Sequence, residues 1–248
     1  MHSRLTTRHS PPVRTELQAL SASATNSVQA QNPPQPLATN ICQLTSNIYN
    51  VRMRDDRWVI VGLGNPGPAY AHNRHNVGYW CVNRLARRHG VSLKARRLAA
   101  LGEGTICGAE VLLVKPRTFM NASGHAVSAA LRHFRVPPER LLVIYDELDL
   151  PLTRLRIKSK GGHGGHNGLR SIVSSAGNSD FPRIRIGIGR PHVDGEPSWE
   201  PDVVAAWSLA DPPPEEAKAL HDAVARAAEA VEAIVREGVE AAMNQYNK

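Results

Sequence analysis

Short apolar runs alternate with longer amphipathic segments over most of this 248-residue chain. Residues 58–63 (WVIVGL), 110–114 (EVLLV) and 141–145 (LLVIY) are apolar runs of strand length, which predicts buried strands. Residues 155–158 form a shorter and more polar strand candidate, and residues 183–188 (RIRIGI) show the period-2 alternation of a strand.

Apolar residues recur at helical spacing in the segments between these strands. Residues 76–89, 122–134 and 167–176 each predict an amphipathic helix. Residues 214–247 consist almost entirely of helix formers with one apolar stripe, which predicts a single long C-terminal helix packed on the domain. The order of elements predicts one α/β domain over residues 58–248, with a mixed, mostly parallel sheet covered by helices.

The first 57 residues lack this periodicity and are rich in Ser, Thr, Asn, Gln and Pro. We expect residues 1–57 to form a disordered or weakly ordered extension. Arginine and serine with few acids would suit an organellar transit peptide over residues 1–52. We favour the alternative, translation from an over-extended start, because Met53 stands just before the first predicted strand.

The charge balance points to a polyanionic partner, nucleic acid above all. Lys and Arg total 30 against 22 Asp and Glu, a net charge of +8 with a pI near 9.8. No apolar run reaches the roughly 18 residues of a membrane span, so we expect no membrane association. The three cysteines form no CxxC pair, which favours a reducing compartment. We therefore predict a cytoplasmic protein, or an organellar one if residues 1–52 are a transit peptide.

A dinucleotide site is the first function that the motifs suggest, and the sequence argues against it. Residues 62–67 (GLGNPG) match GxGxxG directly after a strand, but such a site needs a helix to open there. Pro66 and Pro68 remove amide donors and disfavour that helix. We interpret the glycines as a sharp loop that presents Asn65 at the carboxyl end of the strand.

His75 and Asp146 are the candidates for acid–base chemistry. His75 lies at a loop-to-helix junction, where the helix dipole disfavours protonation, and a neutral imidazole can act as a general base. Asp146 follows a buried strand and can hold an imidazole in one tautomer. A metal site at residues 146–149 is the alternative, but no second cluster has ligand spacing, so we predict no metal.

Two further segments suit ligand contacts. Residues 161–168 (GGHGGHNG) precede a helix, and their glycines allow a backbone to approach an anion closely. There we expect His163 and His166 to position the loop. Asn121 can both donate and accept, which suits a peptide or a base edge. The chain has no GxSxG elbow, so a hydrolase of this sequence would use water as its nucleophile.

Taken together, these motifs resemble those of the bacterial peptidyl-tRNA hydrolase family. The matching stretches cover residues 58–191 in the order VGLGNPG, RHNVG, KPRTFMN-SG, YDELDLP, GGHGGHNGLRS and RIRIGIGRP, and the end of the C-terminal helix, Ala242 to Asn244, is also similar. Two positions depart from the family pattern. Tyr145 stands where histidine is common, and Thr153 stands where glycine is common.

The resemblance implies an esterase that releases tRNA and peptide from peptidyl-tRNA during translation, as a monomer without cofactor or obligate protein partner. It implies that His75 is the catalytic base and Asp146 its orienting partner. The implied substrate contacts are Asn65, Tyr70, Phe119, Asn121 and Asn167, with Lys158 and Arg185 at tRNA phosphates. The alternative is a non-catalytic RNA-binding protein of the same fold that acts in RNA processing. A pure binder has no need of the complete catalytic set, which favours the enzyme.

Overall fold

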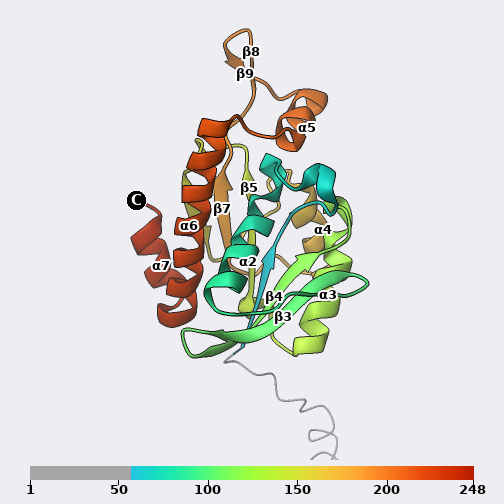
Figure 1. The fold of residues 1–248 in the computed structure, drawn as a ribbon, viewed down its shortest axis with the longest axis vertical. Helices are drawn as coiled ribbons and strands as arrows, with labels where there is room; N and C mark the ends of the chain where they lie inside the picture. Colours follow the sequence, from blue (N-terminus) through green and yellow to red (C-terminus); the bar gives the residue numbers. More distant parts are fainter. Residues whose placement is uncertain (1–56) are drawn as a thin grey trace, which may run out of the picture. The chain divides into compact units, whose positions relative to one another are not determined.

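The structure is a computed structural model that describes residues 57–248. The prediction that residues 1–57 are weakly ordered therefore lies, except for Arg57, outside the described residues. A seven-stranded sheet forms the centre of the described region, with strand order β2-β3-β4-β1-β5-β7-β6 (Figure 1). The strands are β1 (Trp58–Gly62), β2 (Lys94–Ala95), β3 (Ala99–Ile106), β4 (Ala109–Pro116), β5 (Leu141–Glu147), β6 (Leu155–Lys158) and β7 (Arg183–Gly187).

The four central strands are parallel, which confirms the predicted fold class. β1 pairs in parallel with β4 and β5, and β5 pairs in parallel with β7. The antiparallel pairings lie toward the two edges, between β2, β3 and β4 and between β6 and β7. Because parallel strands end at the same side, the carboxyl ends of β4, β1, β5 and β7 meet along one edge of the sheet, where open α/β sheets hold ligands.

Helices cover both faces of the sheet. On one face, α2 (Val77–Arg88) and α6 (Pro214–Glu237) pack over Ile60, Leu142 and Ile184. On the other face, α3 (Ser123–Phe134) and α4 (Asn167–Ala176) pack over Val61, Val143 and other apolar strand residues (Figure 1). β1 and most of β5 are apolar on both faces, as predicted for central parallel strands. No helix within residues 57–248 is long and apolar enough to cross a membrane.

Gly62 of the GxGxxG match and Gly78 of α2 allow close packing of α2 against the strands. A Cβ on Gly62 would lie 2.1 Å from the carbonyl oxygen of Gly78, and a Cβ on Gly78 would lie 2.4 Å from that of Ile144. The segment after Gly67 forms the short 3₁₀ helices η1 (Pro68–Tyr70) and η2 (Arg74–Asn76), and α2 begins only at Val77. The glycines therefore bring α2 close to the strands, and no helix opens at the motif as a dinucleotide site requires.

The prediction of one continuous C-terminal helix is wrong. The helix breaks at Gly238, whose φ of 92° is a conformation that favours glycine, and α7 (Val239–Tyr246) follows. The break lets Asn247 reach the edge strand β6, where its side chain accepts from the Ile157 N–H at 2.7 Å and donates to the Ile157 carbonyl at 3.0 Å. One side chain thus satisfies both backbone groups of Ile157 on this edge strand.

Several elements were absent from the sequence prediction. β2 and β3 were missed because β3 (AALGEGTI) contains two glycines and has no clear alternation. The hairpin of β8 (His192–Val193) and β9 (Glu196–Pro197) and the helix α5 (Pro201–Leu209) were missed because they are short. α5 and the hairpin lie at the carboxyl end of the central strands (Figure 1), beside the site.

Candidate active site

A cavity of about 650 Å³ lies at the edge of the sheet where the parallel strands end. Its wall contains every residue that the sequence predicted for catalysis and for the peptide or tRNA terminus: Asn65, Tyr70, His75, Phe119, Asn121, Asp146 and Asn167. α5 supplies an apolar part of the wall, including Val204 and Leu209. Segments from more than half of the domain therefore converge on one site.

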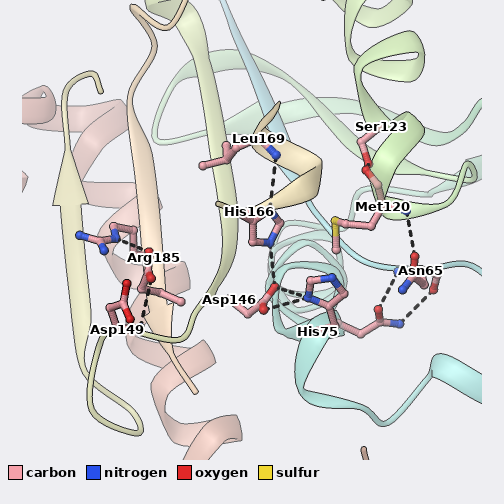
Figure 2. Close-up of polar contacts among 11 residues, drawn as sticks. Asn65, His75, Met120, Ser123, Asp146, Asp149, His166, Leu169 and Arg185 are labelled. Carbon is pink, nitrogen blue, oxygen red and sulfur yellow. Dashed lines mark hydrogen bonds and ion pairs between the residues drawn. The ribbon is translucent and has the colours of Figure 1, made fainter. Parts of the chain in front are cut away.

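His75 and Asp146 form a direct pair (Figure 2). Nδ1 of His75 lies 2.8 Å from both carboxylate oxygens of Asp146. Asp146 belongs to β5 and is 3% exposed, whereas His75 lies on the 3₁₀ helix η2 (Arg74–Asn76) that leads into α2. The rigid strand thus fixes the carboxylate, and the carboxylate fixes the imidazole.

The electrostatics of the pair differ from the sequence-based expectation for His75. Burial raises the pKa of Asp146, but attraction to His75 and His166 and their hydrogen bonds outweigh it and hold that pKa well below its usual range. Burial lowers the pKa of His75, but the attraction and hydrogen bond of Asp146 raise it more, and the net pKa is above its usual value. The contact with Asp146 therefore favours the protonated form of His75, which is opposite in direction to the effect that the sequence analysis expects from the helix start.

His166 is a second imidazole on the same carboxylate. Its Nδ1 accepts from the backbone N–H of Leu169 at 3.3 Å, and its Nε2 lies 3.1 Å from Oδ1 of Asp146 (Figure 2). Since Nδ1 accepts, the proton of the neutral ring is on Nε2, which donates to Asp146. Tyr145, one of the two departures from the family pattern, is buried and packs edge-on against His166 with ring centroids 4.8 Å apart.

The same geometry bears on metal binding. His75, Asp146 and His166 place potential ligand atoms within 4.8 Å of one another. A metal on Nε2 of His166 would require the lone pair there and a proton on Nδ1. The Leu169 N–H donates to Nδ1, which enforces the opposite tautomer. The cluster therefore fits a hydrogen-bond network better than it fits a metal site.

Asn65 is held by residues on both sides of it. Asn76 accepts from the Asn65 N–H at 2.7 Å and donates to the Asn65 carbonyl at 3.1 Å. Oδ1 of Asn65 accepts from the backbone N–H of Met120 at 2.9 Å (Figure 2). This last bond identifies the Asn65 oxygen, and it leaves the Nδ2 amide as the part of the side chain that can donate to a ligand.

The remaining cavity residues that the sequence analysis singled out are two aromatic rings and two amides. Phe119 is 59% exposed, and its ring stands edge-on to Tyr70 with centroids 6.3 Å apart. Asn121 lies exposed in the 3₁₀ helix that follows β4. The Oδ1 atom of Asn167, at the start of α4, accepts from Arg170 at 3.2 Å.

Lys158 lies on the edge strand β6 and Arg185 on its neighbour β7, and neither residue is in the cavity wall. Lys158 is exposed. Arg185 is partly buried, and its Nε donates to Glu147 at 2.7 Å. The two predicted phosphate contacts therefore differ, because the charge of Arg185 already has a carboxylate partner.

Sequence reasoning did not assign the partners that orient the site. His166 was expected only to position its loop, and Asn76 was not singled out. Asn76 adjoins His75 in the motif RHNVG, which is a local signal. The contact of His166 with Asp146 spans 20 positions and depends on how α4 packs beside β5.

An α/β sheet that presents a buried aspartate paired with a histidine to an open cavity is typical of hydrolytic enzymes. The sequence model of the family described as Peptidyl-tRNA hydrolase matches residues 59–248. The chain belongs to the peptidyl-tRNA hydrolase family.

Individual relatives agree with this assignment. The peptidyl-tRNA hydrolase of Chloroflexus aurantiacus is 49% identical over 192 residues, which cover 77% of this chain and 98% of that protein. That of Symbiobacterium thermophilum is 48% identical and covers 76% of this chain and 98% of its own length. The crystal structure of peptidyl-tRNA hydrolase from Acinetobacter baumannii is 39% identical with a TM-score of 0.72, covering 78% of this chain and 95% of that one. These names favour the enzyme over the non-catalytic RNA-binding alternative.

Proposed function

We propose that the protein hydrolyses the ester that joins the peptide to the terminal ribose of peptidyl-tRNA, with His75 as the base that activates water. The observation that carries this proposal is the pairing of His75 Nδ1 with both oxygens of Asp146. An ionised Asp146 accepts a hydrogen bond from Nδ1–H of His75, so the lone pair of the neutral ring is on Nε2. Nε2 is then the atom that takes a proton from water.

The steps follow from that assignment. Water attacks the ester carbonyl while Nε2 of His75 takes its proton, and Asp146 stabilises the imidazolium that forms. The Nδ2 amide of Asn65, fixed by Met120 and Asn76, supports a role as donor to the developing oxyanion. The imidazolium then returns its proton to the leaving ribose oxygen, which releases tRNA and peptide.

The other cavity residues support substrate binding. Asn121 and Asn167 carry amides that suit the peptide or the tRNA terminus, and Tyr70 and Phe119 offer an aromatic wall. Exposed Lys158 suits a phosphate, and such contacts add affinity without sequence readout. In this proposal, the protein acts in translation as a cytoplasmic monomer and uses neither a metal nor an organic cofactor.

The test is a release assay with purified protein. N-acetylated aminoacyl-tRNA should be hydrolysed, and the matched unblocked aminoacyl-tRNA should be hydrolysed far more slowly. Activity should persist in EDTA. Equal rates on both substrates, or activity that vanishes in EDTA and returns with zinc, would contradict the proposal. Binding of tRNA without any release would support the RNA-binding alternative instead.

A further inference from the structure

One aromatic side chain on the cavity wall has no role in the chemistry above. Trp199 follows the β8–β9 hairpin, lines the same cavity as His75, and is 70% exposed. Tryptophan offers a large apolar ring that is mostly buried in folded proteins. A tryptophan so exposed at the mouth of a site suggests that a ligand covers it.

The ring of Trp199 is backed on one face by a cation. The guanidinium carbon of Arg190 lies 3.6 Å from the ring centroid. Arg190 is itself fixed, since its Nε and Nη2 donate to Oδ1 of Asp149 at 3.1 and 2.5 Å and its Nη1 donates to the Ser198 carbonyl at 3.2 Å. Trp199, Arg190 and Asp149 together form what we call the Trp199 platform.

The backbone beside Trp199 is also held in place. Ser198 is 8% exposed, its N–H donates to the Pro191 carbonyl at 2.8 Å, and its hydroxyl accepts from the Glu200 N–H at 3.3 Å. α5 begins two residues after Trp199 and forms part of the cavity wall. The platform is therefore preorganised, so little conformational freedom would be lost when a flat ligand stacks on it.

The chemistry of the platform fits a planar π-system, and the nucleobases of the tRNA end are the planar groups that every substrate molecule has. Peptide side chains vary from one substrate to the next. Single-stranded RNA ends are bound by stacking on aromatic side chains, which tolerates any base. The ester lies on the terminal ribose, so the terminal base is the base nearest to His75.

We propose that Trp199 is a stacking site for the 3′-terminal nucleobase of the substrate, which rests on the proposed function of the cavity. Trp199→Ala should raise KM about 5- to 100-fold with little change in kcat, the range expected for one lost base–aromatic stack. Trp199→Phe keeps a ring and should recover most of the affinity. Val193→Ala, on the hairpin that precedes Trp199 and outside the cavity wall, is the control and should behave as the unsubstituted protein does.

Substrates distinguish the base from the peptide. N-acetylalanyl and N-acetylphenylalanyl esters of one minihelix should suffer equally from Trp199→Ala. On a minihelix whose terminal nucleotide lacks its base, the unsubstituted protein should show a raised KM, and Trp199→Ala should add no further increase. A penalty that persists on the abasic substrate, or that appears only with the phenylalanyl ester, would overturn the proposal.

A binding measurement keeps this test separate from turnover. Uncharged minihelix should quench tryptophan fluorescence in the unsubstituted protein, and the quench should shrink in Trp199→Phe and on the abasic minihelix. If the protein shows this base-dependent quench but no hydrolysis, the proposed activity fails while the stacking site stands. If hydrolysis occurs and the quench is independent of the base, the stacking site is wrong.

Discussion

His166 donates from Nε2 to Oδ1 of Asp146 across 3.1 Å, although the two residues lie 20 positions apart. The same carboxylate oxygen also lies 2.8 Å from Nδ1 of His75. One buried aspartate therefore orients two imidazoles, and each should respond when the other is changed.

His75→Ala should abolish hydrolysis while leaving tRNA binding nearly unchanged. A general base is typically worth about 10²–10⁴-fold, and we expect a loss at or beyond the top of that range. Asp146→Ala should lose at least about tenfold less, because Nε2 can still accept a proton from a poorly oriented ring. Single-turnover rates with saturating enzyme would measure both effects.

The double variant tests whether the two residues act as a pair. His75→Ala/Asp146→Ala should be no slower than His75→Ala, since an orienting group has nothing left to orient. Losses that multiply instead would show that Asp146 acts independently of His75.

The pH dependence of kcat/KM should report the raised pKa of His75. The base must be unprotonated, so kcat/KM should fall as the pH drops through that pKa, above the ordinary histidine value of about 6.5. Asp146→Asn removes the attraction that favours the imidazolium, so the remaining activity should show its acid limb at lower pH. An acid limb that does not move would mean that another group titrates.

His166→Ala should move the acid limb of the pH profile of kcat/KM to higher pH, opposite to the shift expected for Asp146→Asn. Loss of the His166 hydrogen bond leaves the Asp146 charge less compensated, so the pKa of His75 should rise further. The rate at pH 8 should drop about tenfold, in keeping with the worth of a hydrogen bond to a charged group. His166→Gln, whose amide can still donate, should lose less. A purely structural role would change stability without moving the pH profile.

Lys158 and Arg185 should give different responses to alanine. Lys158→Ala should raise KM and lower the slope of log KM against log salt by about 1, as expected for one lost phosphate contact. Arg185→Ala should in addition reduce the free energy of unfolding by about 1–3 kcal/mol, because Glu147, 8% exposed, loses its cationic partner. Glu147→Gln in the Arg185→Ala background should restore part of the lost stability, as measured by urea unfolding. An unchanged salt slope for Lys158→Ala would mean that its side chain does not meet tRNA.

Thr153 occupies a left-handed backbone conformation, with φ of 69°. This backbone conformation is one that glycine adopts easily. Threonine at this position is therefore strained. Thr153→Gly should stabilise the fold by about 0.5–1 kcal/mol, because left-handed backbone is unfavourable for a β-branched residue. The control is Thr105→Gly in β3, which should destabilise by a similar amount. Urea midpoints would compare the two, and a destabilised Thr153→Gly would contradict this account.

The sequence predicted the elements that have a clear period and length. The central strands and α2, α3 and α4 were found because apolar runs and helical stripes mark them. β3 was missed since Gly102 and Gly104 leave room for Val91 instead of presenting side chains of their own. The break at Gly238 was missed because a single glycine does not show whether a helix kinks or continues.

The site was predictable to the extent that motifs are local. Asn65, His75 and Asp146 stand at strand ends or helix starts, where chemistry is expected, and the structure brings them to one cavity. The electrostatic balance was not predictable, because the pKa of His75 depends on its contact with a carboxylate 71 positions away. Trp199 was missed since its segment has no motif.

The position of β1 in the sheet has a consequence for how the chain acquires its structure during synthesis. Both partners of β1 come later, β4 at Ala109–Pro116 and β5 at Leu141–Glu147. A nascent chain that ends before β5 leaves a fully apolar strand with an unpaired side. Pairings of this sequence separation slow folding, since the loop must close before any contact forms. The ribosome therefore delivers nearly half of the domain, up to Glu147, before β1 can pair on both sides, and chaperones would act in that interval.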